Sequence, residues 1–233
     1  NLKNAKLYAL PTTSGSGSEA TPFIVLYNEA FKVKKAIATK EVLPNIIFFN
    51  YSFIKNMPHS ISINSAMDAL GQAIESLISK KRNKYSEKFA YKTINLIIKY
   101  LPLLVINKEN TFLIREKLFT ASIYSGKSIK VAETNLAHAI CDSLGPLTKL
   151  NHGLLVGTFT PICFNFFKRK NFENRQINKI EKIFKENNYK NISNFYSKFL
   201  KNNKINLKLN MFEFYKIKQK ILNVGSMKNC ISI

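Results

Sequence analysis

The chain has 233 residues, 45% of them apolar, with 36 basic and 14 acidic side chains. This length and composition fit one or two folded domains and exclude a disordered chain. The richest apolar stretch, residues 94–106, is interrupted by Lys99 and Pro102 and is too short to span a membrane. No charged-then-apolar leader starts the sequence, so we expect a cytoplasmic location and no membrane partner.

The net charge of +22 is the second feature that bears on partners. It comes almost entirely from lysine, since arginine occurs only at positions 82, 115, 169 and 175. Lysine, asparagine and isoleucine have AT-rich codons, so genome composition accounts for the excess without a polyanionic partner. Specific nucleic-acid surfaces rely on arginine for bidentate contacts. We therefore expect no nucleic-acid partner, although a basic anion-binding or nucleic-acid-binding module stays an alternative.

The expected elements change type along the chain. Residues 7–28 hold two strand-like runs around a Gly/Ser segment, and residues 45–53 resemble a further short buried strand. From about Ser60 onward the apolar spacing becomes helical. Helices are predicted at 62–79, 86–104, 112–128 and 131–144, the last ending at Gly145-Pro146, then from His152 until Pro161 interrupts, with three short amphipathic helices in the Lys-rich tail 172–224.

The segment PTTSGSGSEAT, residues 11–21, has two interpretations. It is either a flexible connector, or a tight loop whose small residues let backbone N–H groups and hydroxyls approach a phosphate or a nicotinamide ribose. Its place directly between two strand-like runs argues against a connector. Composition alone does not decide between the two.

Candidate metal ligands follow in the helical part. In DALGQAIES, Asp68, Gln72 and Glu75 share one helix face at i, i+4 and i+7. Two of the three histidines, His138 and His152, bracket the run HAICDSLGPLTKLNH. Each motif is weak alone, because a solvated Asp or a structural His explains it. Together, one Asp and two His are the residue types that hold a catalytic divalent metal with an open coordination position.

These three motifs, in this order and spacing, resemble the iron-containing (group III) alcohol dehydrogenases, and the resemblance covers residues 7–167. It implies a mainly α fold, with a dehydroquinate synthase-like helical metal-binding domain at 56–233. The last strands of an α/β nucleotide-binding domain, 1–55, would precede it. The chain is then a fragment that lacks most of that first domain, and we expect the fragment alone to be inactive.

The resemblance also implies a set of site residues. Asp68, His138 and His152 would hold Fe²⁺ or Zn²⁺, with Gln72 filling or tuning a fourth position. The cofactor would be NAD(H) or NADP(H). Its nicotinamide side would be lined by Thr12, Thr13, Ser16 and Thr21, and Lys35 would reach its phosphate or ribose.

Two departures from the family pattern matter. Gln72 stands where the family commonly has His, and a neutral amide oxygen binds a late transition metal more weakly than imidazole. Asp142 stands at another common His, near the nicotinamide and a proton path, so we expect it to act as a proton relay. DALGQAIES together with GKSIKVAET resembles the phosphonoacetaldehyde reductase subgroup, and Lys127 would then meet the anionic end of the substrate.

The expected function is that of a metal-dependent alcohol dehydrogenase or aldehyde reductase. It would transfer hydride between NAD(P)H and a small aldehyde, with phosphonoacetaldehyde as a candidate. The alternative suggested by Gln72 and Asp142 is a metal-poor, inactive homologue that serves as a partner subunit. As partners we expect the small aldehyde or alcohol substrate and a second copy of the chain in a homodimer.

Overall fold

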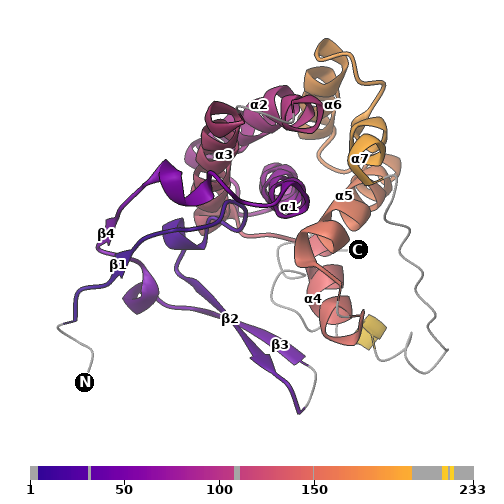
Figure 1. Ribbon diagram of the computed structural model, residues 1–233. Helices are drawn as coiled ribbons and strands as arrows, with labels where there is room; N and C mark the ends of the chain where they lie inside the picture. Colours follow the sequence, from indigo (N-terminus) through magenta and orange to yellow (C-terminus); the bar gives the residue numbers. More distant parts are fainter. Residues whose placement is uncertain are drawn as a thin grey trace.

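The computed structural model describes residues 5–30, 33–107, 111–148, 150–200, 217–219 and 221–222. Most of this part is a bundle of helices, with short strands at the N-terminal end (Figure 1). The helices are α1 (His59–Ile78), α2 (Lys84–Ile106), α3 (Phe112–Ala132), α4 (Leu136–Thr148), α5 (His152–Arg169), α6 (Asn174–Glu186) and α7 (Ile192–Leu200). The mainly helical fold expected from the sequence is confirmed.

The centre of the bundle is α1, which packs against α2, α3 and α5. In Figure 1 it is seen almost end-on, with the other helices around it. Every residue from Ala66 to Ile78 is buried, so the helix is covered on all sides over this length. The polar face of α1 is therefore buried as well as its apolar face. Buried polar groups need hydrogen-bond partners within the protein, and this requirement shapes the site described below.

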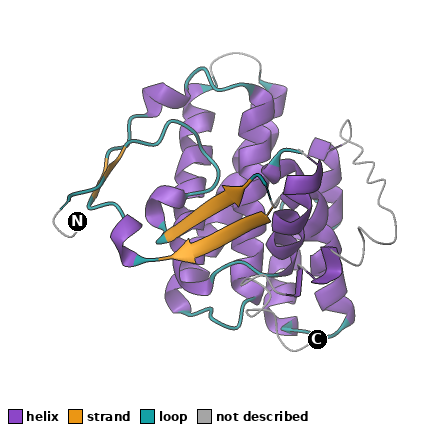
Figure 2. Cartoon of the chain, turned by 90° about the horizontal axis from the view of Figure 1, so that it is seen from below, coloured by secondary structure: helices purple, strands orange, loops and turns teal. Residues whose placement is uncertain are grey.

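The N-terminal strands form two small pairs. β1 (Tyr8–Ala9) pairs in parallel with β4 (Ile46–Ile47), and β2 (Phe23–Asn28) pairs antiparallel with β3 (Val33–Ala38). The β2–β3 hairpin lies against one side of the helices (Figure 2). Short 3₁₀ helices, η2 (Ser18–Ala20), η3 (Lys40–Val42) and η4 (Tyr51–Ile54), connect these elements. The buried strand predicted at 45–53 is shorter than expected, since β4 ends at Ile47 and η4 begins at Tyr51, and Ile46, Phe48 and Phe49 are exposed.

Two helix ends predicted at prolines are wrong. α4 continues through Gly145-Pro146 to Thr148, and α5 continues through Pro161 to Arg169. A proline inside a helix removes one hydrogen bond and costs about 3 kcal/mol. In α5 that cost is offset by burial, since Pro161, Cys163, Phe164 and Phe167 all lie in the interior. Of the three tail helices, α6 and α7 are present, and most of the third lies outside the described residues.

Among the described residues, α2 is long and apolar enough to cross a membrane by length and composition. The sequence was expected to hold no segment of membrane-spanning length, but the helix that contains the apolar stretch 94–106 begins at Lys84 and reaches that length. Its inner face nevertheless belongs to the main core, where Ile94, Ile97, Leu101 and Leu104 are fully buried. In this structure α2 is therefore a core helix, packed against α1 and α3.

Candidate metal centre

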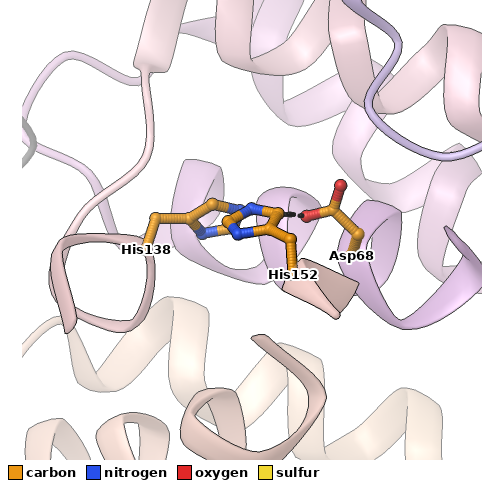
Figure 3. A group of neighbouring side chains, drawn as sticks. All are labelled: Asp68, His138 and His152. Atoms are coloured by element: carbon orange, nitrogen blue, oxygen red, sulfur yellow. Dashed lines mark hydrogen bonds and ion pairs between the residues drawn. The ribbon is translucent and has the colours of Figure 1, made fainter. Parts of the chain in front are cut away.

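Three helices bring Asp68, His138 and His152 together (Figure 3). Asp68 comes from the middle of α1, His138 from the first turn of α4 and His152 from the first residue of α5. One oxygen of Asp68, Oδ1, lies 3.2 Å from Nε2 of His138 and 3.6 Å from Nε2 of His152. One ligand atom from each residue lies within 4.8 Å of the others. The structure therefore assembles the residues that are far apart in the sequence.

This arrangement fits a divalent metal. Two ligands of a tetrahedral ion with bonds of about 2.1 Å lie about 3.4 Å apart. The two oxygen–nitrogen separations at Asp68 bracket that value. Asp68 and His138 are only 6% and 5% exposed, whereas the side chain of His152 is 34% exposed. The centre is therefore buried on one side and accessible on the other, as a catalytic site with an open position requires.

The sequence NHG explains how His152 is placed. The side chain of Asn151 accepts hydrogen bonds from the backbone N–H groups of Gly153 and Leu154, so it caps α5 directly before the histidine. Gly153 then allows α5 to approach α1 closely, since a Cβ there would lie 2.0 Å from the carbonyl oxygen of Asn64. The cap and the glycine together fix where α5 begins, and therefore fix the position of His152.

The electrostatics of the cluster favour charge on Asp68 and His138. Burial alone would raise the pKa of Asp68, but the charges of His152 and His138, a hydrogen bond from His138 and the charge of Lys34 hold it below its usual value. Burial would lower the pKa of His138, yet Glu75 and Asp68 raise it to about 10. Burial, with the charges of His138 and Lys34, lowers the pKa of His152.

The raised pKa of His138 predicts how the metal-free protein responds to pH. The pKa of this histidine is about 10 when folded and 6.5 by reference, so its contribution to stability is complete below pH 6.5. That contribution is lost as the pH rises through 10. We expect the unfolding temperature of the metal-free protein to fall from about pH 7 to about pH 10. Thermal unfolding of a His138→Asn variant is the comparison, and an equally steep decline there would contradict the assignment.

Gln72 lies one turn after Asp68 in α1 and is 5% exposed. Its Oε1 accepts a hydrogen bond of 2.5 Å from Oγ of Ser125 in α3. An amide oxygen has two lone pairs, so this bond leaves one of them for another partner. The role of Gln72 as a fourth ligand stays a prediction, and the structure adds Ser125 as the residue that orients its amide.

The Gly/Ser segment is an ordered loop packed against α3. Gly17 has a left-handed backbone with φ of 58°, and a Cβ on Gly126 of α3 would lie 2.2 Å from the carbonyl oxygen of Gly17. Only glycine at both positions permits this approach. Ser14 is buried, and so is Thr21, whose Oγ1 donates to the carbonyl oxygen of Ser18. These contacts exclude the interpretation as a flexible connector.

The loop borders a pocket of about 260 Å³. Of the predicted cofactor-binding residues, Thr13 and Ser16 line this pocket. Thr12 is exposed, as are Thr13 and Ser16, but is not among the lining residues, and Thr21 is turned into the loop itself. The cofactor roles of all four stay predictions.

The predicted charged residues Asp142, Lys127 and Lys35 lie in three different surroundings. Asp142, one turn after His138 in α4, lies close enough to His152 for its charge to raise the pKa of that histidine. Lys127 in α3 has its Nζ 5.2 Å from the ring centre of Phe89 in α2, and its contact with the substrate stays a prediction. Lys35 is exposed on β3.

Two residues near the centre, Lys34 and Glu75, were assigned no role from the sequence. Lys34, next to Lys35 on β3, reaches over α4, with Nζ 3.4 Å from where a Cβ on Gly145 would lie. Successive strand residues point to opposite faces, but the sequence alone does not tell which face meets the helices. Glu75 binds His138 through Nδ1 at 2.6 Å. The sequence signal for Glu75 was its i+7 spacing from Asp68, which places both residues on one helix face.

Comparisons with known proteins agree with this geometry. Residues 62–211 match the family model "Fe-containing alcohol dehydrogenase family, C-terminal", and residues 1–51 match "Iron-containing alcohol dehydrogenase". The NAD-dependent methanol dehydrogenase of Bacillus methanolicus is 32% identical over 163 residues, which cover 69% of this chain and 42% of that protein. The 1-propanol dehydrogenase of Citrobacter freundii is 31% identical over 146 residues, 63% of this chain and 39% of that protein. The chain thus spans about two fifths of these relatives.

Solved structures share the fold. The sulfoacetaldehyde reductase from Bifidobacterium kashiwanohense, solved in complex with NAD⁺, has a TM-score of 0.81 at 23% identity, with 99% of this chain and 61% of that chain covered. The iron-containing alcohol dehydrogenase from Thermotoga maritima has a TM-score of 0.82 at 24% identity, with 98% and 60% covered. From the two family models and the sequence relatives, the chain belongs to the iron-containing alcohol dehydrogenase family.

Proposed function

We propose that the full-length protein is a metal-dependent alcohol dehydrogenase or aldehyde reductase that transfers hydride between NAD(P)H and a small aldehyde. The observation that carries the proposal is the convergence of Asp68, His138 and His152 from three separate helices. Family membership supports it, since the two relatives compared above are alcohol dehydrogenases. The same groups serve the reverse reaction, oxidation of the alcohol.

Each group of the chain has a stated task in this proposal. Asp68, His138 and His152 hold an iron or zinc ion, and Gln72 lies beside them on α1. When bound, the metal supplies Lewis-acid polarisation of a carbonyl, and the reduced nicotinamide supplies hydride. Thr13 and Ser16 orient the nicotinamide end of the cofactor along the ordered loop. Asp142, near His152, exchanges a proton with solvent on the exposed side of the site.

The first test is an activity screen of the full-length protein with short aldehydes, NADH or NADPH, and added Fe²⁺ or Zn²⁺. Reduction that depends on the metal is the expected result. A protein that contains no metal and reduces none of the aldehydes would instead support the alternative of an inactive partner subunit. Size-exclusion chromatography of the same preparation tests the proposed homodimer.

Among small aldehydes we propose those with an anionic group, phosphonoacetaldehyde included, and we propose Lys34 as the residue that binds the anion. Its Nζ lies 3.4 Å from where a Cβ on Gly145 would lie, in α4, the helix that carries His138. Its charge acts on both Asp68 and His152. A hydrogen bond between charged groups contributes about 1.5–3 kcal/mol.

The Lys34→Met variant tests this assignment, because it keeps the length of the side chain and removes the charge. We expect the KM for phosphonoacetaldehyde to rise at least about tenfold, with little change for propanal. Lys35→Met, an exposed neighbour on the same strand, is the matched control. A rise in the KM for NADH that is equal with both aldehydes would assign Lys34 to the cofactor and contradict the substrate role.

We also propose a cytoplasmic location, where cysteine thiols stay reduced. Cys141 and Cys163 are both buried in the helical core, and burial raises the pKa of the Cys141 thiol well above its usual value. A buried thiol of this kind is a packing residue rather than a nucleophile.

A further inference from the structure

Glu75 is a buried carboxylate that the proposed reaction does not use directly. It lies in α1, two turns after Asp68, and is 3% exposed. Groups of α4 and the residue before it surround its two oxygens. Oε2 accepts hydrogen bonds from Nδ1 of His138 at 2.6 Å and from the backbone N–H of Asn135 at 3.1 Å. Oε1 accepts one from the backbone N–H of Ala137.

We propose that Glu75 is the positioning residue of the metal centre, which holds His138 with its proton on Nδ1 and its Nε2 directed at the metal. This inference rests on the proposed metal-dependent function. It goes beyond the ligand set, because it names the group that decides how one ligand is presented.

The proton position follows from the chemistry of the partner. A carboxylate accepts hydrogen bonds and does not donate them, so the proton in the contact between Glu75 and His138 lies on Nδ1. The opposite nitrogen, Nε2, faces Oδ1 of Asp68 at 3.2 Å, and the proton that it donates to Asp68 in the metal-free protein is released when a metal binds there. A neutral imidazole with its proton on Nδ1 offers the lone pair of Nε2 to a metal. Glu75 thus selects the tautomer that binds.

The same carboxylate fixes where α4 begins. The first backbone N–H groups of a helix have no partner within it, and a negative charge there is favourable. Glu75 accepts from two such groups, at Asn135 and Ala137, while its own backbone carbonyl accepts from the Asn135 side chain. Because His138 is the residue directly after Ala137, fixing the helix start also fixes the histidine.

The two histidines differ in whether Nδ1 of the ring has a hydrogen-bond partner. Within the described residues, Nδ1 of His152 is buried and has no hydrogen-bond partner. Its ring is placed by the start of α5 and by the contact of Nε2 with Asp68, with no partner for Nδ1 in the described part of the chain. His138 is therefore the ligand whose binding depends on a carboxylate behind it. Removing such a partner typically lowers metal affinity about 10- to 100-fold.

The test compares Glu75→Gln with Ser76→Ala in the full-length protein. Ser76 is adjacent and fully buried, and its Oγ has no hydrogen-bond partner among the described residues, so Ser76→Ala is a matched control. Co²⁺ affinity is measured by competition with a chelator, together with the visible spectrum of the bound ion. We expect Glu75→Gln to bind Co²⁺ at least about tenfold more weakly with an altered spectrum, and Ser76→Ala to match the wild type.

Thermal unfolding without metal separates positioning from capping. A Glu75→Gln protein that is less stable but binds Co²⁺ with wild-type affinity and spectrum would overturn the inference and leave the proposed function standing. A wild-type protein that binds no Co²⁺ would overturn both.

A second measurement covers the case in which Glu75→Gln does not fold. In the Zn²⁺-loaded wild-type protein with ¹⁵N-labelled histidine, NMR reports which ring nitrogen of His138 carries the proton. A proton on Nδ1 that exchanges slowly with water supports the inference. A proton on Nε2, with the metal on Nδ1, overturns it.

Discussion

Replacing His152 by alanine in the full-length protein is expected to abolish aldehyde reduction, with kcat lowered on the order of a thousandfold or more. The variant removes one of only three charged or imidazole ligands that converge in the described part of the chain. The fold should persist, because the side chain is 34% exposed at the start of α5 and its removal leaves no closed cavity. The cap provided by Asn151 also stays in place.

The measurements for His152→Ala are the steady-state rate of NAD(P)H oxidation, the metal content and the far-ultraviolet circular dichroism spectrum. His59→Ala is the matched control, since His59 lies at the first residue of α1 and outside the cluster. It should retain both activity and metal. Turnover at the wild-type rate in His152→Ala would remove this histidine from the ligand set.

Replacing Gly153 by alanine should cause the largest loss of stability among single-methyl substitutions near the site, about 3 kcal/mol. The added Cβ would lie 2.0 Å from the carbonyl oxygen and 2.5 Å from the carbonyl carbon of Asn64. Both atoms belong to the backbone of α1 and cannot rotate away. The helices α1 and α5 would have to separate, which also moves His152 away from Asp68.

Urea unfolding of the full-length protein measures this cost, and metal affinity reports the displacement of His152. Gly145→Ala in α4 is the control, because a Cβ there would meet only side-chain ends at ordinary contact distance, Lys34 at 3.4 Å and Leu155 at 3.8 Å. Its effect should stay within about 1 kcal/mol, as for an ordinary helical glycine. Equal unfolding midpoints for the two variants would show that the approach of α5 to α1 does not limit stability.

Periodicity predicted the existence of most helices but not their ends. The apolar spacing that indicates α1, α2 and α3 is a local property, and it was sufficient to place them. The ends of α4 and α5 were wrong because proline is only one contribution to helix stability. Burial of Phe164 and Phe167 beyond Pro161 is a tertiary contribution that the local sequence does not reveal.

The residues of the candidate site also divide into those that the sequence identified and those that only the structure revealed. Asp68, His138 and His152 were identified from residue type, spacing and family resemblance, and the structure brings these three together. The role of Lys127 stays a prediction, and Lys34 was given no role, because nothing in the sequence tells which lysine faces the site. Ser125 and Glu75 were not assigned roles, since both act by filling hydrogen bonds of groups that become buried only when α1, α3 and α4 pack together.

The sequence by itself identified the residues able to bind a metal, because residue type and helical periodicity are local properties of the chain. It also contains the glycines, but their role as points of close approach is apparent only in the fold, where Gly17 packs against Gly126 and Gly153 against Asn64. Only the tertiary structure decided that the polar face of α1 is buried. That burial requires Asp68, Gln72 and Glu75 to have partners on other helices, and those partners join separate residues into one candidate metal centre.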